Sequence, residues 1–314
     1  MLPCHGRVHG FESRTVRMEY SIIKAKGVFQ TFKICLAENV FTFFNYGGQE
    51  TRNESTIKLI IDGLKSNEEV FYNKKLEMVI NTSDPIIENT IGYAHPTDKY
   101  KTIPCFTFDH FKRVGIDNFE NTVSKIKIEA NNTPTINKLF WGGTLDPRVL
   151  PRMLYQLISI KYPNLVLCNS VKRVKGDNPE KLIAYNFVPL PEHCNYKYLI
   201  DIEGLGWSAR LKFLCFTKRV LFINERPYKE FWMDGLKDGE NCIIVKRDLS
   251  NLIEKLEYIE SKPELYHKLS TNLYEFAEKT FTKENINKHI VDVFKKNGEM
   301  AELVYRDGLE NRRL

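Results

Sequence analysis

The sequence lacks several features that would place it in familiar classes of protein. No run of about 18 or more apolar residues occurs, so the chain offers no transmembrane helix. The histidines form no HExxH motif, and neither a Walker loop nor a G-x-S-x-G elbow is present. A zinc protease, a P-loop NTPase and a serine hydrolase of the usual kinds are therefore excluded. Internal repeats are also absent.

The seven cysteines are widely spaced and include no C-x-x-C pair, which argues against a structural zinc site. Their odd number favours reduced thiols. Residues 1–19 contain no apolar stretch before a cleavage site, and the last residues contain no retention signal. We therefore expect a cytoplasmic protein.

The charge balance favours anionic partners. The net charge is +6, from 46 Lys and Arg against 40 Asp and Glu, which suits nucleotides, phosphates, nucleic acid or acidic glycans. The basic residues are scattered among acids rather than gathered in a stripe, so we expect no nucleic-acid partner.

Short apolar runs alternate with amphipathic stretches along most of the chain. The expected strands are 40–46, 76–81, 103–108, 138–141, 164–168, 196–202, 219–223 and 242–245, and the expected helices are 55–64, 147–160, 208–217 and a long one from 248. This alternation predicts an α/β fold with a parallel sheet, whose ligands bind at the carboxyl ends of the strands.

The length of 314 residues fits two domains of ordinary size. The polar, proline-bearing segment 130–135 is the expected boundary between them. The expected units are an N-terminal domain over 1–135, a second domain over 136–285 and a C-terminal helical tail over 286–314.

The strongest local pattern lies in segment 199–213, where a strand ends, two glycines permit a tight turn and a helix is expected to begin at Ser208. The N-terminus of a helix attracts phosphate, and Arg210 and Lys212 add cations beside it. An ordinary capped helix with a solvated basic face would show the same pattern.

Segment 196–214 resembles the signature of glycosyltransferase family 90, the CAP10-like family of protein O-glucosyltransferases and KDEL-containing glycosyltransferases. Phe231-Trp232 and the passage 245–252 extend the resemblance in the same order. The resemblance implies a GT-B architecture of two Rossmann-like domains that face each other. It further implies an inverting transferase whose second domain holds a UDP-sugar and whose first domain contributes the acceptor site.

The resemblance implies roles for residues of the second half. Ser208, Arg210 and Lys212 occupy the family's S-x-R-x-K positions, where the arginine binds the donor diphosphate. Fixed cations here would stabilise the charge that departing UDP gains in the transition state. Glu203 and Gly204 lie just before this motif, and Glu203 is a candidate hydrogen-bond partner of a sugar or ribose hydroxyl.

Asp84 is the candidate general base. An inverting transfer needs a carboxylate to take the proton of the acceptor hydroxyl. Residues 78–85 resemble the family's M-V-I-N-x-x-D passage, which carries its proposed base. Asp84 follows an expected buried strand, so its side chain would face the interdomain cleft. Without the resemblance, an aspartate before proline would indicate a turn.

Further candidates come from two short passages. Segment 140–144 resembles the family's F-R-G-S motif, with Gly143 where serine is usual and Thr144 where arginine is common. Gly142 and Gly143 would allow the backbone to approach a phosphate or sugar. Arg148 lies one residue out of register with the family's second donor arginine, and a solvated arginine after a strand-to-helix turn explains it equally well.

Phe108 belongs to a passage that resembles the family's F-S-F strand. It is a candidate to line the nucleotide or acceptor pocket, although aromatic residues on strands are usually core.

Asp201 and Glu203 come nearest to a metal-binding D-x-D motif, because residues two apart on a strand share a face. The cations that follow could neutralise a diphosphate unaided, so we expect no metal and no other cofactor. The expected activity is transfer of glucose or xylose from a UDP-sugar to a hydroxyl of a glycan or protein. A non-catalytic nucleotide- or glycan-binding protein on the same fold is the alternative, because of the changes at Gly143 and Thr144.

Overall fold

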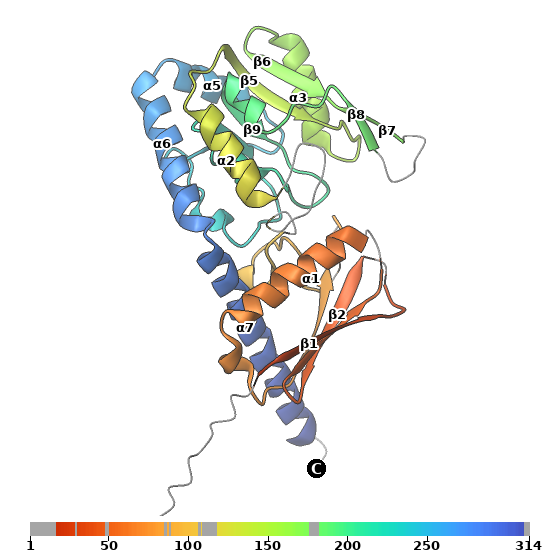
Figure 1. The fold of residues 1–314 in the computed structure, drawn as a ribbon. Helices are drawn as coiled ribbons and strands as arrows, with labels where there is room; N and C mark the ends of the chain where they lie inside the picture. Colours follow the sequence, from red (N-terminus) through yellow and green to blue (C-terminus); the bar gives the residue numbers. More distant parts are fainter. Residues whose placement is uncertain are drawn as a thin grey trace, which may run out of the picture.

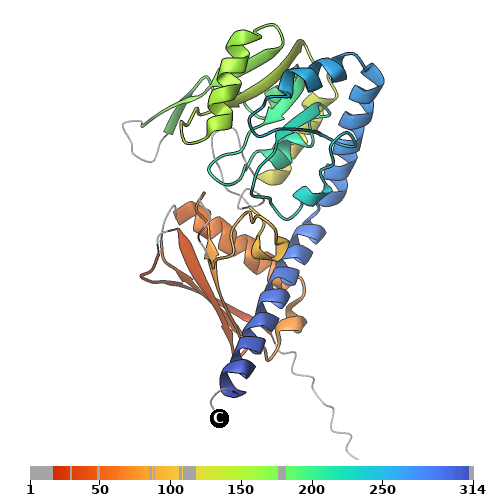
Figure 2. The same ribbon diagram turned by 180° about the vertical axis from the view of Figure 1, so that it is seen from behind.

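The computed structural model shows two α/β lobes, one above the other, with a long C-terminal helix that runs from one to the other (Figures 1 and 2). The structure describes residues 17–310 except 29, 48–49, 85–86, 88, 106–107, 109–117 and 176–181. The predicted α/β fold class with two lobes is confirmed, and the parallel sheet expected of a Rossmann-like domain is found in the second lobe, whereas the sheet of the first lobe is mixed.

The first lobe is built on a mixed sheet. Its strands lie in the order β1 (Glu19–Lys24), β3 (Val40–Asn45), β2 (Thr31–Ala37) and β4 (Leu76–Asn81), with α1 (Glu50–Lys65) against it. Glu38 and Asn39 both have positive φ and join β2 to β3 in a tight turn, which makes these two strands antiparallel. β4 ends at Asn81, and Asp84 follows three residues later.

The second lobe is a doubly wound parallel sheet. Its order is β11 (Ile243–Val245), β10 (Val220–Asn224), β9 (Tyr196–Asp201), β5 (Ile136–Gly143) and β6 (Val166–Ser170), and all neighbours are parallel. In chain order, β5 is the first strand of this sheet, β6 pairs with one side of it and β9 with the other. The point at which the order reverses therefore lies between β5 and β9, which is where ligands of such sheets bind.

Helices cover both faces of this sheet. One core contains side chains of α2 (Phe119–Ala130) and α4 (Leu211–Leu214), the other contains those of α3 (Leu150–Lys161) and α5 (Leu252–Glu260), and α6 (Pro263–Thr280) contributes to both. A small antiparallel hairpin, β7 (Lys172–Lys175) and β8 (Leu182–Tyr185), projects from the lobe (Figure 1).

The cores do not follow the predicted units in every place. α2 falls within 1–135, yet Phe119, Val123 and Ile126 pack into the core of the second lobe. The strand expected over 103–108 is not formed at 103–105, where Pro104 has no N–H to offer a neighbouring strand.

The last helix, α7 (Lys283–Glu310), returns to the first lobe and completes its core. The Phe294 ring lies 6.0 Å from that of Phe41 and 6.2 Å from that of Phe71. Gly63 of α1 permits the close approach, since a Cβ there would lie 2.6 Å from Cδ1 of Ile290. The segment predicted as a tail is thus an integral part of the first lobe.

Replacing Phe294 by alanine should lower the free energy of unfolding by about 3–5 kcal/mol, because the side chain is fully buried and leaves a cavity. Urea denaturation followed by circular dichroism measures the change. Ile128→Ala on α2, where the side chain is 67% exposed, is the control and should change stability by about 0.5 kcal/mol or less. Equal losses in the two variants would contradict this role of α7.

Candidate active site

The site lies at the carboxyl edge of the second sheet, where three neighbouring strands end. β5 ends at Gly143, β9 at Asp201 and β10 at Asn224. Because parallel strands present their ends on one edge, side chains from far apart in the sequence meet here.

Asp201 is the centre of this cluster and is fully buried. Its Oδ1 accepts hydrogen bonds from Ser208 Oγ at 2.8 Å and Arg210 Nε at 3.3 Å, and its Oδ2 accepts from Arg226 Nη1 at 2.9 Å. Burial alone would raise the pKa of Asp201, but Arg226, Arg210 and Ser208 together lower it. The carboxylate therefore stays ionised and orients two guanidinium groups.

Arg210 connects the two strands at the reversal point of the sheet. Besides Asp201 on β9, it donates to the carbonyl of Gly142 on β5. Its guanidinium carbon lies 5.8 Å from the centroid of the Trp141 ring. The predicted residues Ser208, Arg210 and Gly142 are thus brought together.

A second buried carboxylate, that of Glu203, is also paired with an arginine. It is 3% exposed, and its Oε1 accepts from Arg247 Nε at 2.9 Å. Arg152 of α3 donates to the carbonyl oxygens of Glu203 and Thr144, at 3.0 Å each. Gly204 is required for packing, since a Cβ there would lie 2.9 Å from the Trp207 carbonyl.

Four arginines gather at this edge among the residues that the structure describes. Arg210 and Arg226 pair with Asp201, Arg247 pairs with Glu203, and Arg152 donates to the Glu203 carbonyl. Guanidinium groups held in fixed positions are suited to bind an anion such as a phosphate group.

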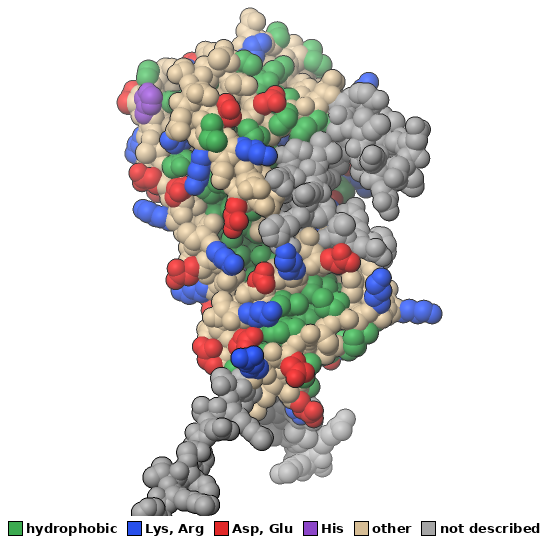
Figure 3. Space-filling view, viewed as in Figure 1, with side chains coloured by type: hydrophobic (Ala, Val, Ile, Leu, Met, Phe, Trp, Pro, Cys, Tyr) green, Lys and Arg blue, Asp and Glu red, His purple; other side chains and the backbone are tan. Residues whose placement is uncertain are grey.

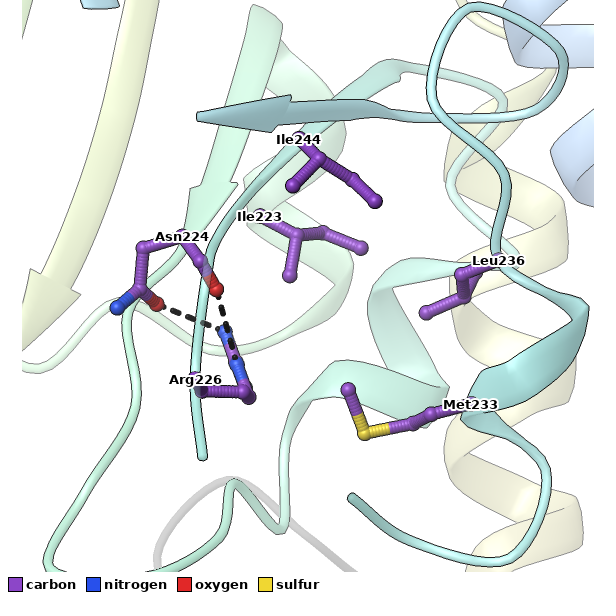
Figure 4. A pocket seen from close by; sticks show the side chains of 6 residues that line it. All are labelled: Ile223, Asn224, Arg226, Met233, Leu236 and Ile244. Carbon is purple, nitrogen blue, oxygen red and sulfur yellow. Dashed lines mark hydrogen bonds between the residues drawn. The ribbon is translucent and has the colours of Figure 1, made fainter. Parts of the chain in front are cut away.

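A small pocket opens beside Arg226 (Figure 4). Arg226 donates through Nη2 to Asn224 Oδ1 at 2.9 Å, which holds both polar side chains at one end of the pocket. The remaining wall is apolar and is formed by Ile223, Met233, Leu236 and Ile244.

Lys212 lies beneath the site rather than in it. The predicted helix over 208–217 is wrong in extent: α4 comprises only Leu211–Leu214, and Ser208, where the helix was expected to begin, donates to Asp201 instead. The fully buried Lys212 ammonium donates to the Ala209 carbonyl at 3.0 Å and lies 3.9 Å from Glu230 Oε2. Through the Ala209 carbonyl, Lys212 helps to hold the loop between β9 and α4 in place.

Three further predicted residues lie outside the arginine cluster. Phe108 packs between the lobes, with its ring 4.8 Å from Phe119 and 4.9 Å from the Lys212 ammonium, while 106–107 lie outside the described residues. Arg148 is exposed and pairs with Asp146 at 2.7 Å. Gly143 ends β5, and its carbonyl accepts from the Val171 amide at 2.9 Å.

Asp84 belongs to the first lobe and contacts the second lobe at this edge. Its side chain is 51% exposed, and its Oδ1 accepts from Arg52 Nη1 at 3.0 Å. Its backbone touches the loop that precedes Ser208, because a Cβ on Gly206 would lie 2.4 Å from the Asp84 carbonyl oxygen. The lobes therefore meet where the predicted base follows β4 and the predicted donor loop follows β9.

Sequence reasoning missed Arg52, Arg152, Arg226 and Arg247. Arg226 lies two residues after the end of β10, so a search for cations just beyond the predicted strand ends would have found it. Arg52 offers no such signal, because its partner is 32 residues away in the chain.

Other expectations concern metals, thiols, membranes and charged surfaces. Among the residues that the structure describes, no three His, Cys, Asp or Glu side chains are grouped to hold a metal ion. The six described cysteines are free thiols, and no described helix is long and apolar enough to cross a bilayer. On the face shown in Figure 3, cationic and anionic side chains are intermixed.

The fold and site define a two-lobed α/β protein with a cluster of arginine side chains at the junction of its lobes. The chain belongs to glycosyl transferase family 90, whose model matches residues 90–306. The family resemblance read from the motifs is confirmed.

Known proteins give the following similarities. The chain is 29% identical over 134 residues to protein O-glucosyltransferase 1 of Homo sapiens, a match that covers 42% of this chain and 33% of the relative. It is 27% identical over 192 residues to O-glucosyltransferase rumi of Drosophila melanogaster, covering 54% of this chain and 47% of the relative. The match thus spans between a third and a half of the length of these relatives.

Among solved structures, Anabaena HepE in complex with UDP-glucose gives a TM-score of 0.35 at 10% identity, covering 62% of this chain and 57% of that one.

The buried His193 should make stability depend on pH. Burial and the nearby charge of Arg210 lower the pKa of His193 to about 3, against about 6.5 in an unfolded chain. Below pH 6.5 the unfolded state binds a proton on His193 and the folded state does not. The free energy of unfolding should therefore decrease by up to about 1.4 kcal/mol for each unit by which the pH is lowered.

His193→Gln keeps an N–H donor for the Val188 carbonyl but removes the titration. Urea denaturation of both proteins at intervals from pH 7 to pH 5 should show a shallower loss in the variant. Parallel curves would mean that His193 is not held neutral.

Proposed function

We propose that this chain transfers glucose or xylose from a UDP-sugar to a hydroxyl of a glycan or protein, with inversion at the anomeric carbon and without a metal ion. The observation that carries this proposal is the contact between Asp84 of one lobe and the loop of the arginine cluster of the other. An acid–base group and an anion site then share one junction.

The arginine cluster is suited to a nucleotide diphosphate. Arg210 and Arg226 are held by Asp201, and fixed guanidinium groups suit the negative charges of the diphosphate in a UDP-sugar. When the bond from the anomeric carbon to the phosphate oxygen breaks, negative charge grows on UDP, and prealigned guanidinium groups stabilise it without reorganisation. The apolar pocket beside Arg226 offers a surface for the uracil ring (Figure 4).

The same arginines support a reaction without metal. Asp201 and Glu203, the D-x-E pair that could ligate a cation, already accept hydrogen bonds from Arg210, Arg226 and Arg247. The positive charge that a metal would bring to the diphosphate is supplied by side chains.

Asp84 is proposed as the base. The acceptor oxygen attacks the anomeric carbon, its proton passes to the Asp84 carboxylate, and UDP departs from the opposite face of the sugar. Arg52 donates to one carboxylate oxygen of Asp84 and restricts the position of the group. The names of the relatives, O-glucosyltransferases, favour glucose as the sugar.

Asp84→Asn should reduce turnover by about 100- to 10,000-fold, because an amide cannot accept the proton. UDP release from UDP-glucose and UDP-xylose, with p-nitrophenyl glycosides as acceptors, measures turnover. Titration calorimetry with UDP should give an affinity close to that of the unmodified chain. Undiminished turnover would exclude Asp84 as the base, whereas UDP binding by the unmodified chain with no turnover of either donor would indicate a binding protein.

Arg210→Ala should weaken UDP binding by about 10- to 100-fold, because it removes a charge-assisted hydrogen bond donor from the cluster. Lys197→Ala is the control: Lys197 lies near the start of β9, at the end of that strand remote from Asp201, and is paired with Glu260 at 2.8 Å. It should leave the affinity for UDP unchanged in calorimetry. Equal affinity in the two variants would remove the cluster as the diphosphate site.

A further inference from the structure

Trp207 belongs to the loop between β9 and α4 of the second lobe, yet its side chain lies in the core of the first lobe. It is 9% exposed, and its ring centroid is 4.9 Å from that of Tyr93. The loop that carries Glu203 and Arg210 is therefore anchored in the opposite lobe by an aromatic side chain.

Gly206, the preceding residue, lies directly against the backbone of the first lobe. A Cβ there would lie 2.4 Å from the Asp84 carbonyl oxygen, which is a backbone atom and cannot turn away. Its φ lies outside the left-handed region, so the requirement at this position is for the absence of a side chain.

Trp207 is also connected to Asp84 through side chains of the first lobe. The Tyr93 hydroxyl lies 2.7 Å from Thr56 Oγ1, and Thr56 donates to the Arg52 carbonyl at 2.8 Å. Arg52 in turn donates to Asp84 Oδ1 at 3.0 Å. The position of the indole is thus coupled to the carboxylate by a chain of buried contacts.

On its other side the anchor adjoins the arginine cluster. The Trp207 carbonyl accepts from the Gly204 amide at 3.3 Å, and Ser208, the next residue, bonds to Asp201. A shift of Trp207 would move Ser208 and Arg210 relative to Asp84.

Other contacts also hold the lobes together. His95 and Lys229 exchange two backbone hydrogen bonds of 3.0 Å, and Phe231 stacks on His289 with centroids 4.0 Å apart. Loss of the anchor would therefore loosen the loop without separating the lobes.

We propose that Gly206 and Trp207 form an interlobe clamp that sets the separation between Asp84 and the arginine cluster, which makes Trp207 a positioning residue for sugar transfer. The proposal rests on the function proposed above for these two groups. A misplacement of about 1 Å between reacting groups can reduce a rate about 100-fold.

Kinetics separate positioning from binding. Trp207→Ala should lower kcat for UDP release from UDP-glucose by about 10- to 100-fold, with the Kd for UDP nearly unchanged. Trp207→Phe keeps an aromatic ring against Tyr93 and should restore most of kcat. Gly206→Ala should lower kcat in the same way, whereas Gly92→Ala, whose Cβ would meet nothing nearer than 3.8 Å, should not.

Phe71→Ala is the matched control for Trp207→Ala, because Phe71 is a 2% exposed aromatic in the same core and away from the junction. It should destabilise the first lobe and leave kcat intact at a temperature at which all variants are folded. An equal loss of kcat in Phe71→Ala would show that Trp207 acts through stability alone and would overturn the clamp.

Amide hydrogen exchange gives a readout that needs no activity. Exchange over 203–211 should be about tenfold faster in Trp207→Ala and unchanged in Phe71→Ala, since the loop belongs to the other lobe. Unchanged exchange in Trp207→Ala would overturn the clamp. If the unmodified chain releases no UDP from either donor, the proposed function fails, and the exchange data alone decide on the clamp.

Discussion

A carboxylate with no exposed surface sets the arrangement of the site. Asp201 is buried at the end of a central strand and stays ionised, so it must be matched by positive charge and hydrogen bonds. Arg210, Arg226 and Ser208 meet that requirement, and in doing so they lose the freedom that exposed arginine side chains normally have. The burial of one charge thus fixes the directions in which the cations point before any ligand arrives.

Other charged side chains around Asp201 are held by contacts of the same kind. Arg210 reaches from Asp201 to the end of β5, and Arg247 neutralises Glu203 while remaining 59% exposed. Below them, the buried Lys212 holds the loop through the Ala209 carbonyl. Cations that are exposed enough to meet a ligand are supported by groups that are not, which is how a site keeps its geometry.

Much of this could be predicted from the sequence, because it depends on local pattern. The strand over 76–81 and the strand that ends near Asp201 were expected from continuous apolar runs, and the resemblance singled out Ser208, Arg210 and Asp84. What escaped prediction depends on contacts between distant parts of the chain. Lys212 was expected to bind the donor, because nothing near it in sequence reveals that Glu230 would be its buried partner.

The domain limits escaped prediction for the same reason. α2 is amphipathic, and its sequence does not say which of two sheets its apolar face will cover. Nor does the sequence of α7 show that Ile290 and Phe294 will return to strands more than 200 residues earlier.

That return bears on how the chain acquires its structure during synthesis. The second lobe has all its strands and most of its helices once α6 has emerged from the ribosome, and its contacts are mostly internal. The first lobe, although translated earlier, must wait for α7 before its aromatic core can close. Nascent β1 to β4 therefore expose apolar surface throughout translation of the second lobe, and this half of the molecule is the one for which chaperones have the most time to bind.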